Sequence, residues 1–323
     1  MSVKTQFSKN DIIEMLSHYN VGALLSFTPL SPGSVQTNYV VLTTTGKFVL
    51  KYYENRTSTE VLYELALLKE LHTASFPCVP PTLPCDKTLC LYQEKPYVLF
   101  PFIQGTHVKH PNRIQQNNLV TLIARLGRLT QNLSLPKAEN RLHYNITALQ
   151  SLALAAAKHE NTPGGHQKLE WLMRESQMLI LPDSLCRGIC HCDYTDTNIL
   201  YRGNEIHALL DFDDANETYL FFDIISFINF FAPSFSHATW IQSDEHTDIL
   251  DFSQAKMFLP LFEKTLPIPA LDKMHLYDIL KLSILFDAVW YFKRGASNDF
   301  YEKRKIDALN IVGRERFFQM LFA

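Results

Sequence analysis

The chain is poor in glycine and cysteine and has no long hydrophobic run. Of its 323 residues, 11 are glycine and 6 are cysteine. The first residues, MSVKTQFSKNDIIEML, contain no apolar core of the kind that defines a signal peptide. The most apolar segment, LSILFDAVWYFKRG, is interrupted by Asp287, so no run reaches the roughly 18 residues that span a bilayer. We therefore expect a cytoplasmic protein without a membrane partner, whose cysteines stay reduced.

The sequence also has no strongly basic segment. Its formal net charge is −3, and lysines and arginines are scattered among acidic residues, which argues against a nucleic-acid partner. Cys186, Cys190, His191 and Cys192 lie close together, but no second ligand pair with the spacing of a zinc site accompanies them. With 46% hydrophobic residues, the composition is that of a globular protein with one large domain or two smaller ones.

The amino-terminal part has the pattern of a small sheet with one helix. Residues 23–53 contain three runs rich in β-branched and aromatic residues, separated by Pro-Gly and Thr-Gly turns. A helix is predicted over residues 57–72, where Thr57 and Glu60 have the spacing of a capping box. Two more strand-like runs lie between residues 87 and 103. The pattern predicts a five-stranded antiparallel sheet.

The rest of the chain is mainly helical. It follows a polar connector, residues 104–113, that contains glycine and proline. The exceptions to the helical pattern are two short runs, residues 198–203 and 205–214, which predict a hairpin. We therefore predict an α+β fold with two lobes, an amino-terminal nucleotide-binding lobe over residues 1–102 and a helical lobe over residues 103–323.

The segment HCDYTDTNIL contains residue types that phosphoryl transfer requires. His191, Asp193 and Asn198 have the H-x-D-x4-N spacing of a kinase catalytic loop, and Asp211 follows after a predicted strand, turn and strand. Transfer from ATP needs a carboxylate that takes the proton of the attacking hydroxyl and hard oxygen ligands for Mg²⁺. We therefore assign Asp193 as the catalytic base and Asn198 and Asp211 as Mg²⁺ ligands.

The amino-terminal part supplies candidates for binding the phosphates. Lys51 ends a predicted strand after a glycine-containing turn, where its amine can reach the α- and β-phosphates of ATP. Glu64 in the following helix is the preferred ion-pair partner of Lys51, since the alternative, Glu60, already belongs to the capping box. The turn at Gly33 and Ser34 is the candidate phosphate loop, although it has one glycine where such loops usually have more. Each signal is common alone, and their order is what favours a kinase.

With these motifs the chain resembles the aminoglycoside phosphotransferase and choline kinase superfamily, which has a protein-kinase-like fold. The stretch LSPGSVQTNYVVLTTTGKFVLKYYENR is most similar to bacterial homoserine kinases of this fold. The later stretches HCDYTDTNILY and ALLDFDDANETYLFFDIISF support the superfamily alone.

The resemblance implies further roles. The backbone of the hinge from Phe100 through Phe102 to Gly105 would receive adenine, while His191 would pack the catalytic loop and Asp223 would hold that loop from its helix. The sequence departs from the family pattern at three positions: Cys192 replaces a usual glycine, no proline precedes Asn198, and Asp213 stands where protein kinases have glycine. None of these departures removes a group that touches ATP or metal.

The phosphate acceptor is less well determined by the sequence. Asp213, Asp214 and Glu217 form an acidic cluster that either binds a cationic acceptor or caps the next helix. A homoserine acceptor would instead require a cation for its carboxylate, for which the candidates by residue type are Arg141, Lys293 and Arg294.

We predict an ATP- and Mg²⁺-dependent kinase that phosphorylates a hydroxyl of a small molecule, homoserine or a related amino alcohol. The alternatives are an aminoglycoside kinase, a choline or ethanolamine kinase, and a nucleotide-binding pseudokinase without activity. A pseudokinase is expected to lose at least one catalytic residue, whereas this chain keeps Lys51, Asp193, Asn198 and Asp211. The sequence leaves the oligomeric state open.

Overall fold

A computed structural model of the chain describes residues 4–30, 35–230, 250, 252–294 and 300–323. The chain forms two compact units, each assembled from separate segments. The first unit contains residues 1–115, 134–141 and 195–215, and the second contains residues 116–133, 142–194 and 216–323. This division differs from a single boundary after residue 102, because the chain returns twice to the first unit.

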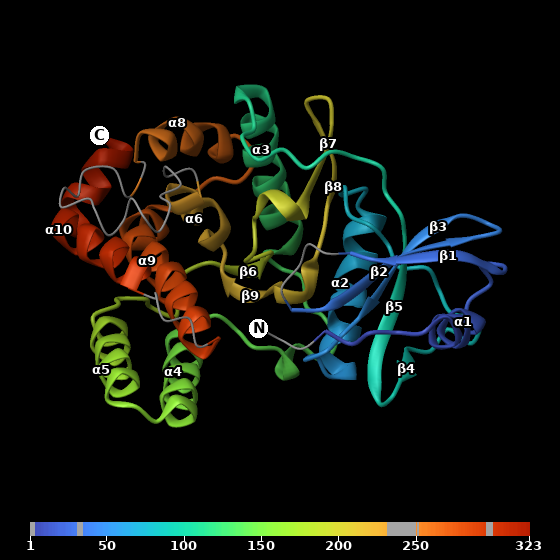
Figure 1. Cartoon of the computed structure of the whole chain (residues 1–323). Helices are drawn as coiled ribbons and strands as arrows, with labels where there is room; N and C mark the ends of the chain where they lie inside the picture. Colours follow the sequence, from blue (N-terminus) through green and yellow to red (C-terminus); the bar gives the residue numbers. More distant parts are fainter. Residues whose placement is uncertain (1–3, 31–34, 231–249, 251, 295–299) are drawn as a thin grey trace. The chain divides into compact units, whose positions relative to one another are not determined.

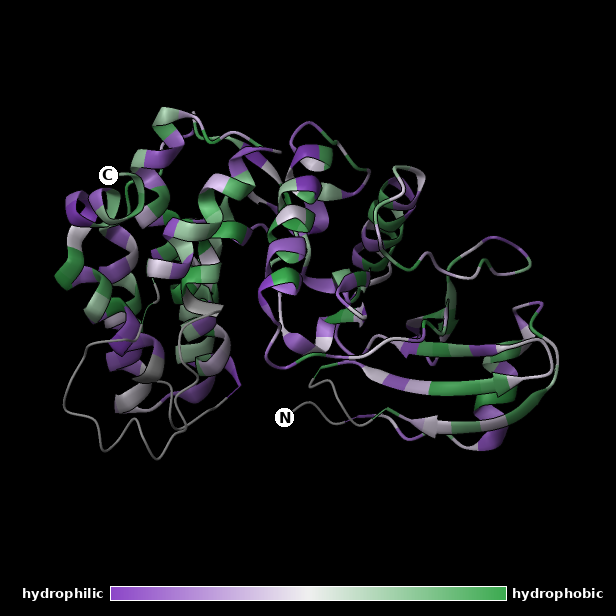
Figure 2. Cartoon of the chain, turned by 90° about the horizontal axis from the view of Figure 1, so that it is seen from above, coloured by the Kyte–Doolittle hydropathy of each residue, from purple (hydrophilic) through white to green (hydrophobic). Residues whose placement is uncertain are grey.

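The first unit contains the predicted five-stranded antiparallel sheet, with strand order β1-β2-β3-β5-β4. Its strands are β1 (Leu24–Pro29), β2 (Thr37–Thr43), β3 (Lys47–Tyr52), β4 (Cys90–Tyr92) and β5 (Lys95–Pro101). Buried and more exposed positions alternate along β2, because successive side chains of a strand point to opposite faces. Figure 2 shows hydrophobic and hydrophilic bands along the strands of this sheet. Lys51 lies on the central strand β3, paired with Asn38 of β2 and Val98 of β5.

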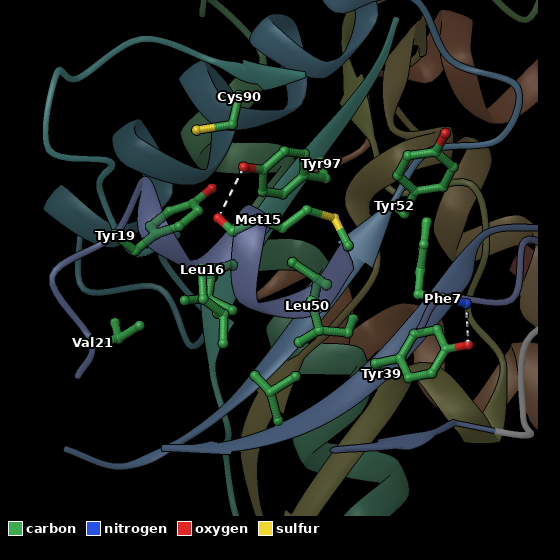
Figure 3. Packing of buried hydrophobic residues seen from close by; sticks show 13 residues of the cluster. Phe7, Met15, Leu16, Tyr19, Val21, Tyr39, Leu50, Tyr52, Cys90 and Tyr97 are labelled. Carbon is green, nitrogen blue, oxygen red and sulfur yellow. Dashed lines mark hydrogen bonds between the residues drawn. The ribbon is translucent and has the colours of Figure 1, made fainter. Parts of the chain in front are cut away.

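Helix α1 (Lys9–Ser17) packs on the sheet through a cluster of buried apolar side chains. Met15 and Leu16 of the helix join Tyr39 and Tyr97 of the sheet in this core, which Figure 3 shows. The hydroxyl of Tyr97 donates a hydrogen bond to the carbonyl of Met15 at 2.9 Å, and the backbone N–H of Phe7 donates to the hydroxyl of Tyr39 at 3.2 Å. The tyrosines therefore bury their rings while their hydroxyls keep polar partners.

Helix α2 (Ser58–Thr73) lies beside the sheet, as Figure 1 shows. It begins with the predicted capping box, in which Thr57 accepts from the backbone of Glu60 and the Glu60 side chain accepts from the backbone of Thr57. Val61 of the helix packs with Tyr53 and with Val98 of β5. Helix α2 therefore packs against β5, on which Val98 pairs with Lys51.

The first unit also contains the predicted hairpin, formed by β7 (Ile199–Arg202) and β8 (Glu205–Leu209). Thr106 of the connector exchanges two backbone hydrogen bonds of 2.9 Å with Tyr201 of β7. A Cβ atom at Gly105 would lie 3.1 Å from the Cβ of Leu200, so glycine permits this close approach. Three 3₁₀ turns belong to the same unit: η1 (Ala138–Asn140), η2 (Asp196–Asn198) and η3 (Phe212–Asp214).

The second unit is mainly helical. Its elements are most of α3 (Arg113–Thr130), α4 (Ile146–Glu160), α5 (Pro163–Gln177), the two-stranded pair β6 (Arg187–Cys190) and β9 (Asn216–Tyr219), α6 (Phe222–Phe230), α8 (Phe252–Glu263), α9 (Ala270–Lys293) and α10 (Phe300–Phe322). Helix α9 is buried along most of its length, because apolar residues occupy nearly all its sides between residues 276 and 292. Within the described ranges, no helix has the length and apolar character needed to cross a membrane.

Candidate active site

Lys51 is the centre of a group of charges in the first unit, in which Lys51 and Glu64 are buried and the side chain of Asp211 is 39% exposed. The side chain of Lys51 is 8% exposed, and its Nζ lies 2.7 Å from Oδ1 of Asp211 and 3.3 Å from Oε1 of Glu64. Burial alone would lower the pKa of Lys51, but Asp211 and Glu64 outweigh it and hold that pKa well above its usual value. The amine therefore stays protonated, as contact with phosphate oxygens requires.

Glu64 is the acidic residue of α2 that contacts Lys51. Its other carboxylate oxygen accepts a hydrogen bond of 3.0 Å from the hydroxyl of Tyr53. Glu60, one helical turn earlier, accepts from the backbone of Thr57 at 2.8 Å and is occupied by the helix cap. Of the two candidates for the ion pair, Glu64 therefore contacts Lys51, whereas Glu60 belongs to the helix cap.

Asp211 begins the short loop that follows β8. It has a left-handed backbone with a φ of 60°, a region that aspartate adopts more often than most residues other than glycine. Asp213, two positions later, accepts a hydrogen bond of 2.8 Å from the side-chain amide of Gln36 and lies 4.0 Å from Nζ of Lys51. Lys51 therefore faces both carboxylates of the loop.

The two aspartates differ in their electrostatic surroundings. Burial acts to raise the pKa of Asp213, but Lys51 and Arg56 outweigh it and lower the pKa. The pKa of Asp211 is raised, first by burial and then by the neighbouring charge of Asp213. A bound divalent cation would favour the ionised form of Asp211, because an opposite charge stabilises the carboxylate.

The residues around Asp211 fit a magnesium ion. The backbone N–H of Leu210 donates a hydrogen bond of 2.8 Å to the carbonyl of Asn198, so Asn198 and Asp211 lie on adjacent segments. An amide oxygen and a carboxylate are hard ligands of the kind that Mg²⁺ prefers. Among the described residues no group of three or more His, Cys, Asp or Glu side chains is suited to hold a metal. Two protein ligands agree with the usual Mg²⁺ site, which keeps waters and substrate oxygens as its other ligands.

The residues of the predicted catalytic loop around Asp193 lie in the second unit, directly after β6. The carboxylate of Asp223, on α6, accepts hydrogen bonds from the backbone N–H groups of His191 at 2.8 Å and Cys192 at 3.0 Å. The backbone N–H of Asp193 donates to Nδ1 of His191 at 3.3 Å. Burial raises the pKa of Asp223 to about 7, although these two backbone donors act to lower it. Asp223 and His191 together fix the backbone on which Asp193 is carried.

Cys192 has a left-handed backbone with a φ of 65°. Glycine, the residue that the resemblance implies at this position, adopts this conformation without strain. The side-chain amide of Asn216 donates to its sulfur at 3.4 Å, and Asp223 holds its N–H. The cysteine is therefore accommodated without a change in the path of the loop.

Asp193 has an acidic neighbour on α9. The charge of Asp193 contributes to a raised pKa of Asp287, about 6, of which burial is the largest cause. Lys305 and Arg294 act on Asp287 in the opposite direction. The half-buried Asp193 therefore lies in a part of the second unit that contains charges of both signs.

The predicted hinge residues Phe100 and Phe102 make contacts with other residues of the first unit. Phe100 packs with both Val98 and Leu200, and Phe102 donates its N–H to the carbonyl of Lys47 at 3.0 Å. Gly33 and Ser34 lie outside the described residues.

The acidic cluster does not stay together in one unit. Asp213 and Asp214 belong to the first unit, where Arg56 pairs with both carboxylates. Glu217 lies on β9 of the second unit, and its carbonyl is 3.2 Å from Nδ1 of His143. The negative charge of the two aspartates is thus opposed by the half-buried guanidinium of Arg56.

The three cations considered for a carboxylate also differ in position. Arg141 is buried and donates to backbone carbonyls of the loop after Asp211. Lys293 and Arg294 are exposed at the end of α9. Sequence reasoning missed the contacts that Gln36, Arg56 and Arg141 make with the loop, because the partners are between 71 and 177 positions apart in the chain.

Known proteins similar to this chain are kinases of small molecules. The model of the phosphotransferase enzyme family matches residues 26–255. The homoserine kinase of Rhodopseudomonas palustris (strain BisA53) is 25% identical over 316 residues, which cover 96% of this chain and 88% of that protein. The homoserine kinase of Bradyrhizobium diazoefficiens has the same identity and coverage.

Solved structures with a similar fold include an amicoumacin kinase bound to AMP-PNP, Ca²⁺ and its substrate, with a TM-score of 0.64 and 15% identity over 97% of this chain and 94% of the other. A microcompartment-associated aminopropanol kinase has a TM-score of 0.61 and 15% identity over 97% of this chain and 100% of the other. These similarities confirm the resemblance and the protein-kinase-like α+β fold predicted from the motifs.

Proposed function

The chain belongs to the phosphotransferase enzyme family, and on that premise we propose that it transfers the γ-phosphoryl group of ATP to the hydroxyl of homoserine or a related amino alcohol. Its membership and its relatives make it a nucleotide-binding enzyme that phosphorylates a hydroxyl group of a small molecule. The observation that carries the proposal is the position of Lys51 between Glu64 and Asp211, because this arrangement combines a phosphate-binding cation with a metal-binding carboxylate.

In the proposed reaction, the residues of the chain bind, orient and deprotonate. Lys51 contacts phosphate oxygens, and Glu64 keeps its amine in place. Asp211 and Asn198 hold Mg²⁺, which when bound neutralises the charge of the phosphates. Asp193 takes the proton of the acceptor hydroxyl as that oxygen forms a bond to the γ-phosphorus, while the bond from this phosphorus to the β,γ-bridging oxygen breaks and ADP leaves.

The amino-terminal residues 1–102 are proposed to hold the nucleotide. The backbone between Phe100 and Phe102 receives the adenine, and Gly33 with Ser34 approaches the phosphates. His191 and Asp223 are proposed to support the base rather than to touch the substrates. Asp213 and Asp214 stay candidates for contact with a cationic acceptor, as does Glu217.

Homoserine is the preferred acceptor because the curated relatives that cover nearly the whole chain are homoserine kinases. Phosphorylation of an aminoglycoside or of an amino alcohol such as ethanolamine is the second candidate, since the structural neighbours include kinases of spectinomycin and aminopropanol. A pseudokinase without turnover is disfavoured because Lys51, Asp193, Asn198 and Asp211 are all present.

The test is an ADP-release assay with Mg²⁺ and ATP against homoserine, choline, ethanolamine, aminopropanol and several aminoglycosides. We expect turnover with homoserine, abolished in Asp193→Asn and retained in the control Asp196→Asn, which makes the same change three positions later. Turnover with another acceptor alone would overturn the choice of homoserine. Near-normal turnover in Asp193→Asn would overturn the assignment of Asp193 as the catalytic base.

A further inference from the structure

The loop from Asp211 to Ala215 has a backbone that its own residues do not fully stabilise. Asp211 is left-handed, and a single 3₁₀ turn follows it, closed by a hydrogen bond of 3.1 Å from the N–H of Ala215 to the carbonyl of Phe212. Backbone of this kind persists where surrounding groups hold it in place. The loop therefore needs donors from elsewhere for its remaining carbonyls.

Arg141 supplies these donors from a distant part of the chain. Its Nε donates to the carbonyl of Ala215 at 3.1 Å, and its Nη2 donates to the same carbonyl at 2.8 Å. The same Nη2 also contacts the carbonyl of Phe212 at 3.5 Å and the carbonyl of Asp213. Three carbonyls of one short loop thus converge on a single guanidinium.

The burial of Arg141 indicates why an arginine occupies this position. The residue is 6% exposed, and burying a charged group is costly unless several partners compensate it. A guanidinium presents a rigid fork of donors, whereas a lysine ammonium acts as one compact charge on a flexible stem. The fork is used at Ala215, whose carbonyl accepts from both Nε and Nη2, an arrangement that a lysine ammonium does not reproduce.

Arg141 also contacts the helix that carries Glu64. Its guanidinium carbon lies 5.2 Å from the centre of the Tyr63 ring, within the range of a cation–π interaction. Tyr63 directly precedes Glu64, which contacts Lys51, and Lys51 in turn contacts Asp211. Arg141 consequently touches both elements that position the amine of Lys51.

We infer that Arg141 is a positioning residue that sets the affinity for Mg²⁺ by fixing the backbone of Asp211, and that it does not receive a substrate carboxylate. The inference rests on the proposed function, since it takes Asp211 as a metal ligand. Residues 134–141 belong to the first unit, and on this inference their function is to place the Arg141 side chain against the loop.

The test uses the full chain with Arg141→Met, which removes the donors, and Arg141→Lys, which keeps the charge and is expected to fold. Calorimetry gives the affinity for ATP at a series of Mg²⁺ concentrations. We expect the Mg²⁺ concentration for half-maximal ATP affinity to rise at least tenfold in Arg141→Met and less in Arg141→Lys. Hydrogen exchange without any ligand should be at least tenfold faster for amides of residues 211–215, with β3 unchanged.

The control is Arg314→Met in the second unit. Like Arg141, Arg314 donates several hydrogen bonds, in its case to the carboxylate of Asp278 and the carbonyl of Met178. This variant should lower the melting temperature and leave the Mg²⁺ dependence unchanged. The inference would be overturned if both Arg141 variants also lowered the melting temperature and left the Mg²⁺ dependence unchanged, with unchanged hydrogen exchange in residues 211–215. If the affinity of the wild type for ATP did not depend on Mg²⁺, the assignment of Asp211 as a metal ligand would be overturned instead. Hydrogen exchange in residues 211–215 would still decide whether Arg141 fixes the loop.

Discussion

Asp223 accepts a hydrogen bond of 3.0 Å from the backbone N–H of Cys192, a residue 31 positions earlier in the chain. Its second oxygen accepts from the N–H of His191 at 2.8 Å. One carboxylate therefore satisfies two consecutive backbone donors of the segment that leads to Asp193. Asp193, the proposed base, is thus held through its own main chain, and the carboxylate that holds it belongs to α6.

The first prediction concerns this carboxylate. Asp223→Asn keeps one acceptor oxygen but turns an NH₂ group toward the other backbone donor, which then stays unsatisfied. We expect the free energy of unfolding near pH 7 to fall by about 1–3 kcal/mol and turnover to fall at least tenfold, because the base is less well placed. Denaturant unfolding and ADP release measure the two effects.

The matched control is Ser226→Ala on the same helix. Among the described residues, the hydroxyl of Ser226 bonds to the carbonyl of Phe222 within α6, at 2.7 Å, so this variant should change turnover less than twofold. Equal turnover in Asp223→Asn and the wild type would show that the loop keeps its shape without the carboxylate.

Local patterns were sufficient to predict much of the first unit. Runs rich in β-branched and aromatic residues predicted the strands, and the capping box at Thr57 and Glu60 marks the start of α2 within one residue, because both signals depend on neighbours in the chain. The choice of Glu64 for the ion pair also followed from this cap, since the cap already occupied Glu60.

Contacts between distant segments could not be predicted in this way. The sequence shows no relation between Gln36 and Asp213, which are 177 positions apart, or between Arg141 and the same loop. Residues 134–141 and 195–215 likewise belong to the first compact unit, although nothing in their own sequence relates them to residues 1–115. Such contacts depend on how whole elements pack, and no local periodicity encodes them.

The second prediction separates the two glutamates of α2. Glu64→Gln removes the charge that faces Lys51 at 3.3 Å and leaves Asp211 as the closest carboxylate to the amine. We expect kcat/KM for ATP to fall at least tenfold, because the amine is then displaced from the phosphates. Glu60→Gln alters the capping box and the ion pair of Glu60 with Arg56 at 3.5 Å, neither of which involves Lys51, and should cost about 1 kcal/mol or less of stability without changing that constant. A loss in the Glu60 variant that matched the Glu64 variant would refute the assignment.

The third prediction concerns the left-handed backbone of Cys192. Cys192→Gly relieves the strain of a φ of 65° but loses the contact with Asn216 and makes the unfolded chain more flexible. These effects oppose each other, so we expect stability within about 1 kcal/mol of the wild type and unimpaired turnover. Cys192→Val places a branched side chain in the same conformation and should be destabilised by at least about 1 kcal/mol. A higher free energy of unfolding for Cys192→Gly than for Cys192→Val, measured by denaturant unfolding, would support the left-handed backbone at this position.

The fourth prediction follows from the raised pKa of Asp223, which is about 7 in the folded protein against 3.8 for the unperturbed group. Between these values the folded protein holds a proton on Asp223 that the unfolded chain has released, so the contribution of this group to stability is complete below pH 4 and is lost as the pH rises through 7. Asp287, with a pKa of about 6, acts in the same direction. The nearby Cys190 and Tyr194 have pKa values that burial raises, so they stay neutral in this window.

Asp223→Asn removes one of these titrations and leaves the others in place. The difference in unfolding free energy between wild type and variant should therefore be largest near pH 4.5 and should shrink toward pH 7.5, because only the wild type loses stability through this group as it ionises. Denaturant titrations of both proteins at intervals of half a pH unit measure this difference directly. A difference that stays constant with pH would mean that Asp223 is ionised throughout, with its two backbone donors outweighing its burial.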